Sequence, residues 1–130
     1  MHRSFLLSGA LLGGIAVILG AFGAHGLKKI VPPETVGTFQ TGVQYQMYHA
    51  LALILVAIVF EKAGQQNMLQ LAGYCFLTGI VLFSGSLYIL TAIKATDKVG
   101  LEKIGILTPI GGLFFVAGWL LFFIGIWRNK

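Results

Sequence analysis

One stretch of the chain carries polar and aromatic side chains that can hydrogen-bond a ligand within a membrane. Thr41, Gln44, Tyr45, Tyr48 and His49 recur at positions i, i+3, i+4, i+7 and i+8, so on a helix they form one continuous stripe. Imidazole, amide and phenol groups supply hydrogen-bond donors and acceptors without a fixed charge. Because such groups lack partners in hydrocarbon, we expect the stripe to face the other helices or a water-filled cavity.

The elements that must position this stripe are four long apolar runs, and none of them contains Asp, Glu, Lys or Arg. They cover roughly residues 5–24, 41–60, 69–92 and 104–126. A hydrocarbon core about 30 Å thick needs about 20 helical residues, and each run meets that length. The sequence therefore predicts an all-α polytopic membrane protein, a bundle of four transmembrane helices with both termini on the same side. The expected helices, within a single domain 1–130, are about 4–25, 34–61, 68–93 and 104–127.

The first run raises the alternative of a cleaved signal peptide, because a basic start precedes an apolar stretch. This run is longer than the apolar core of a signal peptide, which has about 7–15 residues, so we expect a retained transmembrane helix.

Composition limits the partners that the chain can bind. Hydrophobic residues make up 57% of the sequence and charged residues 10%, which leaves no material for a separate soluble domain. The net charge of +5 lies at the ends and in the loops, where it suits anionic lipid headgroups; we see no basic helix that would bind a nucleic acid. We expect membrane lipids as partners, with other membrane proteins or a second copy of the chain as further candidates. The cationic residues are Arg3, Lys28, Lys29, Lys62, Lys94, Lys98, Lys103, Arg128 and Lys130.

These charges do not decide the orientation. The first and third loops hold five of them and the opposite side holds four, a margin too small for the positive-inside rule.

Small residues recur at helical spacing in the first and last runs. In the first run the steps alternate between four and three residues, at Gly9, Gly13, Ala16, Gly20 and Gly23. In the last run the glycines are seven residues apart, at Gly111, Gly118 and Gly125. Smooth helix faces of this kind allow close approach in lipid, where the hydrophobic effect does not drive association. We therefore expect Gly9, Gly13, Gly20, Gly111 and Gly118 to be helix-packing positions.

Polar residues concentrate in the half of the bundle next to the first and third loops. At about 1.5 Å per residue, His49 and Tyr88 have similar depths, about 10 Å, and are expected to be able to meet. The candidate ligand-binding residues are His49, Gln44, Tyr45, Tyr48, Thr41, Tyr88 and His25. One interpretation gives them only interhelical hydrogen bonds of about 0.6 to 2 kcal/mol each. The other is a shallow one-leaflet pocket for an anionic or quinone-like amphipathic ligand.

Metal, haem and catalytic sites have little support in the sequence. His25 and His49 could supply two imidazoles, but the helical rise offsets them by about 12 Å in depth. No carboxylate, serine–base pair or metal-ligand cluster lies within a span, so we expect no catalytic residue, no metal and no cofactor. The sequence favours a non-enzymatic accessory, assembly or scaffold subunit. The alternative is binding or transport of a lipid or quinone-like ligand centred on His49.

Several strings resemble one known family. They are GAFGAHGLK at 20–28, FQTGVQYQMYHALAL at 39–53, SGSLY at 84–88 and TPIGGLFFVAGW at 108–119. These blocks, in this order, resemble the YgdD/YwdK-like family of small bacterial inner-membrane proteins, which has a mitochondrial relative in animals. The resemblance covers nearly the whole chain and implies a four-helix protein of the bacterial inner or plasma membrane. It carries over no catalytic or binding residue, because the family's biochemical role is unassigned.

Overall fold

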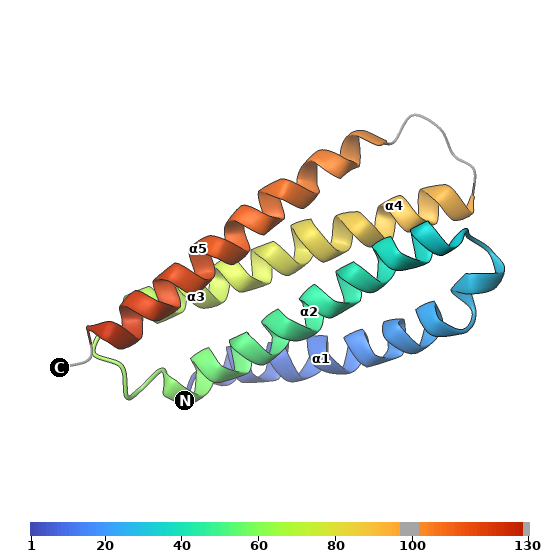
Figure 1. Ribbon diagram of the computed structural model, residues 1–130. Coiled ribbons are helices and arrows are strands. Elements are labelled where there is room, and N and C mark those ends of the chain that lie inside the picture. The colour runs from blue at the N-terminus through green and yellow to red at the C-terminus, as the bar shows by residue number, and fades with distance from the viewer. Residues whose placement is uncertain (97–101, 129–130) are drawn as a thin grey trace.

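Four long antiparallel helices make up the computed structural model, which describes residues 1–96 and 102–128 (Figure 1). Each is long and apolar enough to cross a membrane. The α-helices are α1 (Arg3–Ala24), α2 (Pro33–Val59), α3 (Gln66–Gly79), α4 (Gly85–Ala95) and α5 (Leu107–Trp127). A π-helical segment, η2 (Ile80–Ser84), joins α3 to α4, and short 3-10 turns, η1 (Leu27–Lys29) and η3 (Glu102–Ile106), precede α2 and α5.

The start of α1 and the end of α5 lie at the same end of the molecule (Figure 1). The predicted all-α, four-helix membrane fold with both termini on one side is therefore confirmed. Two of the lysines expected at the membrane surface, Lys98 and Lys130, lie outside the described residues.

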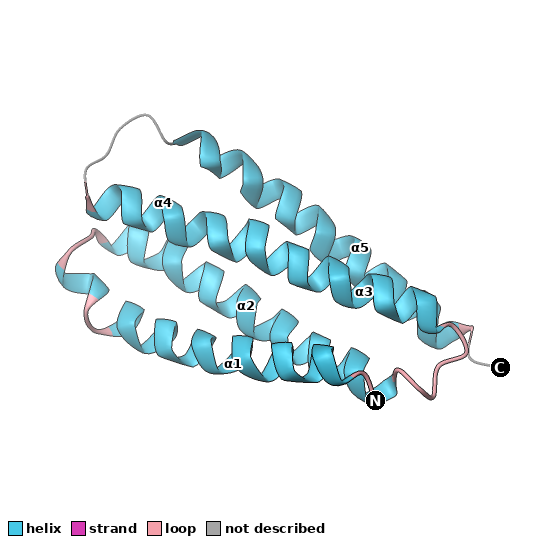
Figure 2. Ribbon diagram, turned by 180° about the vertical axis from the view of Figure 1, so that it is seen from behind, coloured by secondary structure: helices cyan, strands magenta, loops and turns pink. Residues whose placement is uncertain are grey.

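The helices lie side by side in the order α1, α2, α3–α4, α5, and views from the front and from behind agree on this order (Figures 1 and 2). α1 packs along α2, and α2 also packs on α3, η2 and α4. α5 packs along α3 and η2, then diverges from α4 toward η3 (Figure 1). In its most apolar window α2 has 50% of its residues buried, against 17% for α1, so α2 is the central helix and α1 the outermost.

Some of the small residues of α1 allow it to pack closely on α2, and others do not touch α2 tightly. A Cβ added at Gly9 would lie 2.7 Å from the side chain of Ile54, and one at Gly23 would lie 2.7 Å from Gln40. At Gly13 and Gly20 the nearest atoms would be 3.9 and 3.4 Å away. The two helices therefore approach most tightly toward the two ends of α1, and Gly13 and Gly20 leave space for a methyl group.

α5 packs on α3 and η2 through glycines that repeat every seven residues. From one glycine to the next, the residue that it faces on the other helix lies seven positions earlier in the sequence. The two helices therefore keep one antiparallel register. The pairs are Gly111 with Phe83, Gly118 with Phe76 and Gly125 with Leu69. A Cβ at Gly118 would lie 2.7 Å from the Phe76 ring, and one at Gly111 would clash with the backbone nitrogen of Phe83.

The π segment lies where α2, α4 and α5 meet. Ser84, at its end, is fully buried and donates a hydrogen bond of 2.7 Å to the carbonyl oxygen of Gly42 on α2. Phe83, in the same segment, has its backbone against Gly111 of α5. π turns are often found at functional sites, and Phe83 of this one lines the space between α2 and α5.

Candidate functional site

His49 is buried near the middle of α2 and is hydrogen-bonded at both ring nitrogens. Its Nδ1 lies 2.6 Å from the carbonyl oxygen of Tyr45, and its Nε2 lies 3.1 Å from Nε1 of Trp119 on α5. A carbonyl oxygen only accepts and an indole N–H only donates, so Nδ1 carries the proton and Nε2 accepts. The imidazole is therefore neutral, and neither ring nitrogen is free to bind a ligand.

Aromatic packing fixes the orientation of the His49 ring. Its centroid lies 3.5 Å from that of Phe115, and the two rings are inclined by only 9°. Phe76 and Trp119 lie 5.5 and 5.9 Å away, centroid to centroid. The histidine is consequently part of a rigid aromatic wall that joins α2 to α5.

Next to this wall is a groove between α2 and α5, with a volume of about 630 Å³. Among the described residues its lining is aromatic and apolar and includes no Asp, Glu, Lys or Arg. The lining residues are Tyr45, Tyr48, His49, Phe83, Pro109, Gly112, Leu113, Phe115, Val116 and Trp119. We call this space the α2–α5 groove; its size lies within the range of small-molecule sites, about 300–1,000 Å³.

Two tyrosine hydroxyls of this groove have no partner in the described part of the chain. Tyr45 is 38% exposed and Tyr48 is 54% exposed, and neither hydroxyl makes a hydrogen bond to another described residue. The Tyr45 ring packs on Phe83 with a centroid distance of 4.6 Å. The phenols thus lie along the groove with their polar ends available.

Because these tyrosines lie deep along the span, a hydroxyl without a hydrogen-bond partner there is unfavourable in free energy. α2 has 27 residues and is about 40 Å long, and residue 46 lies at its middle. In a bilayer centred on the helix, Tyr48 is about 12 Å from the nearer edge of a hydrocarbon core about 30 Å thick. An unpaired hydroxyl in such surroundings costs about 2–7 kcal/mol. A molecule in the groove that accepts hydrogen bonds would remove this cost.

A second polar network links α1, α2 and α4. Gln46 is 3% exposed; its Nε2 donates to the carbonyl oxygen of Leu12 on α1 over 2.8 Å. Its Oε1 accepts a hydrogen bond of 2.6 Å from the Tyr88 hydroxyl on α4. Tyr88 therefore pairs with Gln46, and the expected meeting with His49 does not occur.

The candidate residues thus divide into three groups. Tyr45, Tyr48 and His49 line the α2–α5 groove, and Tyr88 belongs to the Gln46 network. The remaining three do not line the groove: Thr41 donates to the carbonyl oxygen of Gly37 in its own helix, while Gln44 and His25 are exposed.

The expectation that the whole stripe turns inward is wrong for Gln44, which is exposed. α2 and α5 leave a groove between them, whereas α1, η2 and α4 cover other faces of α2. The stripe therefore borders an open groove and is only partly enclosed.

Sequence reasoning missed Gln46 and Trp119. Gln46 lies off the i, i+3, i+4 stripe, and its only signal is a further amide in an apolar helix. Trp119 is 70 positions from His49, and its signal is an indole N–H in an apolar run, a group that needs a partner when buried. Among residues 1–96 and 102–128, no three His, Cys, Asp or Glu side chains lie close enough to hold a metal ion.

Four apolar helices linked by side-chain hydrogen bonds define an integral, multi-pass protein of the cell membrane. Residues 19–112 match a family described as "Protein of unknown function (DUF423)", and the chain belongs to this family. This confirms the family resemblance found in the sequence.

Three relatives show how far the similarity extends. The UPF0382 membrane protein YwdK of Bacillus subtilis (strain 168) is 42% identical over 119 residues, 92% of each chain. The UPF0382 inner membrane protein YgdD of Escherichia coli (strain K12) is 38% identical over 128 residues, 98% of this chain and 92% of the relative. A UPF0382 membrane protein of Haemophilus influenzae is 37% identical over 130 residues, 100% of this chain and 98% of the relative. No solved structure matches the chain.

Proposed function

We propose that this protein is a non-enzymatic accessory membrane protein that binds an amphipathic lipid or quinone-like molecule in the α2–α5 groove. The observation that carries the proposal is the pair of groove-lining hydroxyls, Tyr45 and Tyr48, which have no partner among the described residues at mid-membrane depth. Quinone and ester carbonyl oxygens accept hydrogen bonds from phenols. The aromatic and apolar lining suits the ring or chain of the same molecule.

In this proposal His49 is a positioning residue. Both of its ring nitrogens are already hydrogen-bonded, so it fixes Trp119 and presents its ring face beside the groove. Binding is favoured over proton-coupled transport, because the described residues of the groove lining include no acidic one and the histidine is held neutral by its partners.

A scaffold role without a small ligand is the second candidate function. It is supported by the buried polar side-chain atoms of the described residues, which all have a hydrogen-bond partner within the chain. In that case the groove would receive a helix of another membrane protein or of a second copy, and the tyrosines would donate to it.

Co-purification tests the proposal. The wild type and the double variant Tyr45→Phe/Tyr48→Phe are purified in mild detergent, and bound lipids and quinones are quantified by mass spectrometry against the source membrane. The matched control is Tyr74→Phe, since Tyr74 is 51% exposed on α3 and does not line the groove. We expect one enriched amphipathic species in the wild type and the control and its loss from the double variant. Equal content in all three proteins would overturn the proposal.

A direct probe uses the two tryptophans of the chain. Trp127→Phe leaves only Trp119, which lines the groove, and Trp119→Phe leaves only Trp127, which is 74% exposed at the end of α5. With decylubiquinone as the quencher in nanodiscs, we expect saturable quenching of Trp119 and a non-saturating response of Trp127. Saturable quenching of neither tryptophan, combined with an enriched phospholipid, would assign the groove to a lipid.

A further inference from the structure

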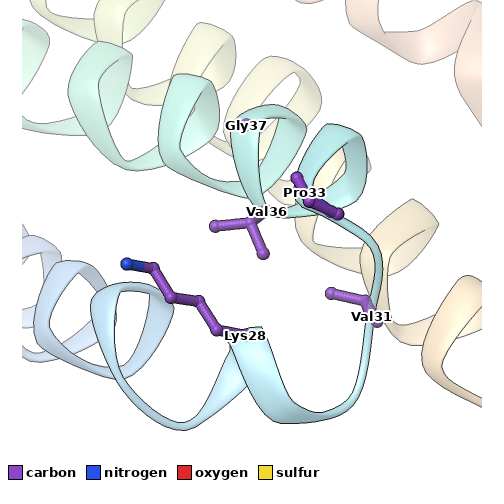
Figure 3. Close-up of a pocket in the computed structure, with 5 residues that line it drawn as sticks. All are labelled: Lys28, Val31, Pro33, Val36 and Gly37. Carbon is purple, nitrogen blue, oxygen red and sulfur yellow. The ribbon is translucent and has the colours of Figure 1, made fainter.

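A second pocket lies away from the α2–α5 groove, between the turn that ends the first span and the start of α2. It has a volume of about 420 Å³ and is lined by Lys28, Val31, Pro33, Val36 and Gly37 (Figure 3). Among the described lining residues, Lys28 alone is charged, and the others present apolar surface. Figure 3 shows Pro33 and Val36 of α2 opposite Lys28, with the ammonium group at the end of the pocket remote from Val31.

The turn that carries Lys28 is held in place by its neighbours. Leu27 is 3% exposed and Val31 is 7% exposed, and both pack in an apolar cluster with Phe39 and Val43 of α2. Lys28 is exposed and forms no ion pair within the described part of the chain. Its ammonium group is therefore placed by a fixed backbone and remains available to an anion.

Gly37 lines the pocket from α2. A Cβ added there would meet nothing within 4 Å. A larger side chain at this position of α2 would consequently extend into free space without displacing the protein. Gly37 thus provides a way to fill the pocket while leaving the fold intact.

The pocket also lies at the membrane boundary. The apolar span that begins at Arg3 ends at Lys29, and the next span begins at Pro33, so the lining residues flank the point where the chain leaves the bilayer and returns. Lysine ammonium groups at this level attract the phosphates of anionic lipids. The apolar side chains beside Lys28 match the first acyl carbons, which lie below the phosphate.

We infer that this pocket binds one anionic phospholipid at its headgroup end, with its phosphate at Lys28 and its first acyl carbons against Val36 and Pro33. The inference is independent of the proposed function, because the two sites have no described lining residue in common.

The test compares two adjacent lysines of equal charge. Lys29 is exposed like Lys28 but does not line the pocket, so Lys28→Gln and Lys29→Gln change the net charge equally and only the first alters the site. Each protein is reconstituted into nanodiscs of phosphatidylcholine and phosphatidylglycerol at a four-to-one ratio, and the phosphatidylglycerol retained per protein is counted by native mass spectrometry. We expect one retained molecule in the wild type and Lys29→Gln, and about fivefold weaker retention in Lys28→Gln.

Gly37→Leu tests the apolar part of the site and should also abolish retention, since its side chain fills the pocket. Equal loss in Lys28→Gln and Lys29→Gln would overturn the inference in favour of a diffuse surface charge. Displacement of phosphatidylglycerol by inorganic phosphate would overturn it too, because it would define a site for a free anion. Should Gly37→Leu fold poorly, Lys28→Glu against Lys29→Glu decides, since both positions are exposed and charge reversal there leaves the core unchanged.

Discussion

Trp119 donates a hydrogen bond of 3.1 Å to Nε2 of His49 and so joins α5 to α2 across the edge of the α2–α5 groove. The backbones of these two helices are kept apart by the groove and share α3 and η2 as neighbours. Side chains therefore provide the direct connection between α2 and α5. The bond also sets the histidine tautomer, because it requires an unprotonated Nε2.

Removing this bond should lower the free energy of unfolding, and a double-mutant cycle measures the contribution of the bond as a coupling energy. In a double-mutant cycle of His49→Ala and Trp119→Phe, we expect a coupling of about 0.6–1.7 kcal/mol, as for other hydrogen bonds between transmembrane helices. Unfolding in mixed micelles of dodecyl maltoside and sodium dodecyl sulfate provides the measurement. Trp127→Phe, at the exposed end of α5, serves as the control and should show no coupling to His49. Additive effects of the first pair would mean that the bond contributes nothing.

Substitutions of Gln44 and Gln46, both on α2, should differ sharply in their effect on stability. Gln46→Leu leaves the Leu12 carbonyl and the Tyr88 hydroxyl without their partner, and an unsatisfied buried group costs about 1–3 kcal/mol. Gln44→Leu changes an exposed side chain and should be nearly neutral. Thermal unfolding in detergent compares the two variants. A lower Tm for the Gln44 variant would contradict the assigned network.

Adjacent glycines of α5 offer a matched pair for helix packing. A methyl group at Gly111 meets the backbone of Phe83, which cannot move as a flexible side chain can, so Gly111→Ala should cost about 1–3 kcal/mol. At Gly112 the nearest atom to an added Cβ is 3.9 Å away, so Gly112→Ala should be neutral or slightly stabilising. The same detergent unfolding assay applies. Similar stability of the two variants would mean that α5 is packed less closely than described.

Membrane topology can be tested with single cysteines in a Cys75→Ala background. A cysteine at Ser4 in the first turn of α1 and one at Arg128 after α5 should react with an impermeant maleimide from the same face of the membrane. Ile30→Cys, in the exposed connection between α1 and α2, should react from the opposite face. Labelling of Ser4→Cys and Arg128→Cys from opposite faces would contradict the four-span topology.

The four spans could be predicted because the thickness of the bilayer fixes the length of an uncharged apolar run. The positions within those runs at which the helices touch were harder to predict. The spacing of small residues indicated packing faces on α1 and α5, but it did not distinguish Gly9, which touches α2 closely, from Gly13, which leaves room. That difference depends on how the two helices cross, a property of pairs of helices that one helix does not encode.

The candidate site was only partly predictable for a similar reason. Helical periodicity found Tyr45, Tyr48 and His49, since they lie on one face of one helix. The partner of His49 comes from another helix, and the partner of Tyr88 lies off the stripe. The π segment escaped prediction as well, because its hydrogen-bond pattern depends on how α5 and α2 pack around Phe83 and Ser84.

The π segment has a consequence for insertions and deletions. A π turn closes its hydrogen bonds one residue later than an α turn, so η2 absorbs one extra residue while α3 and α4 keep facing their own neighbours. Deleting one residue within Ile80–Ser84 should therefore restore a regular α turn and leave both flanks in register. Deleting one residue within α3 would instead rotate the part of the helix beyond it by about 100°. The long third span should thus tolerate a change of length best at its most irregular turn.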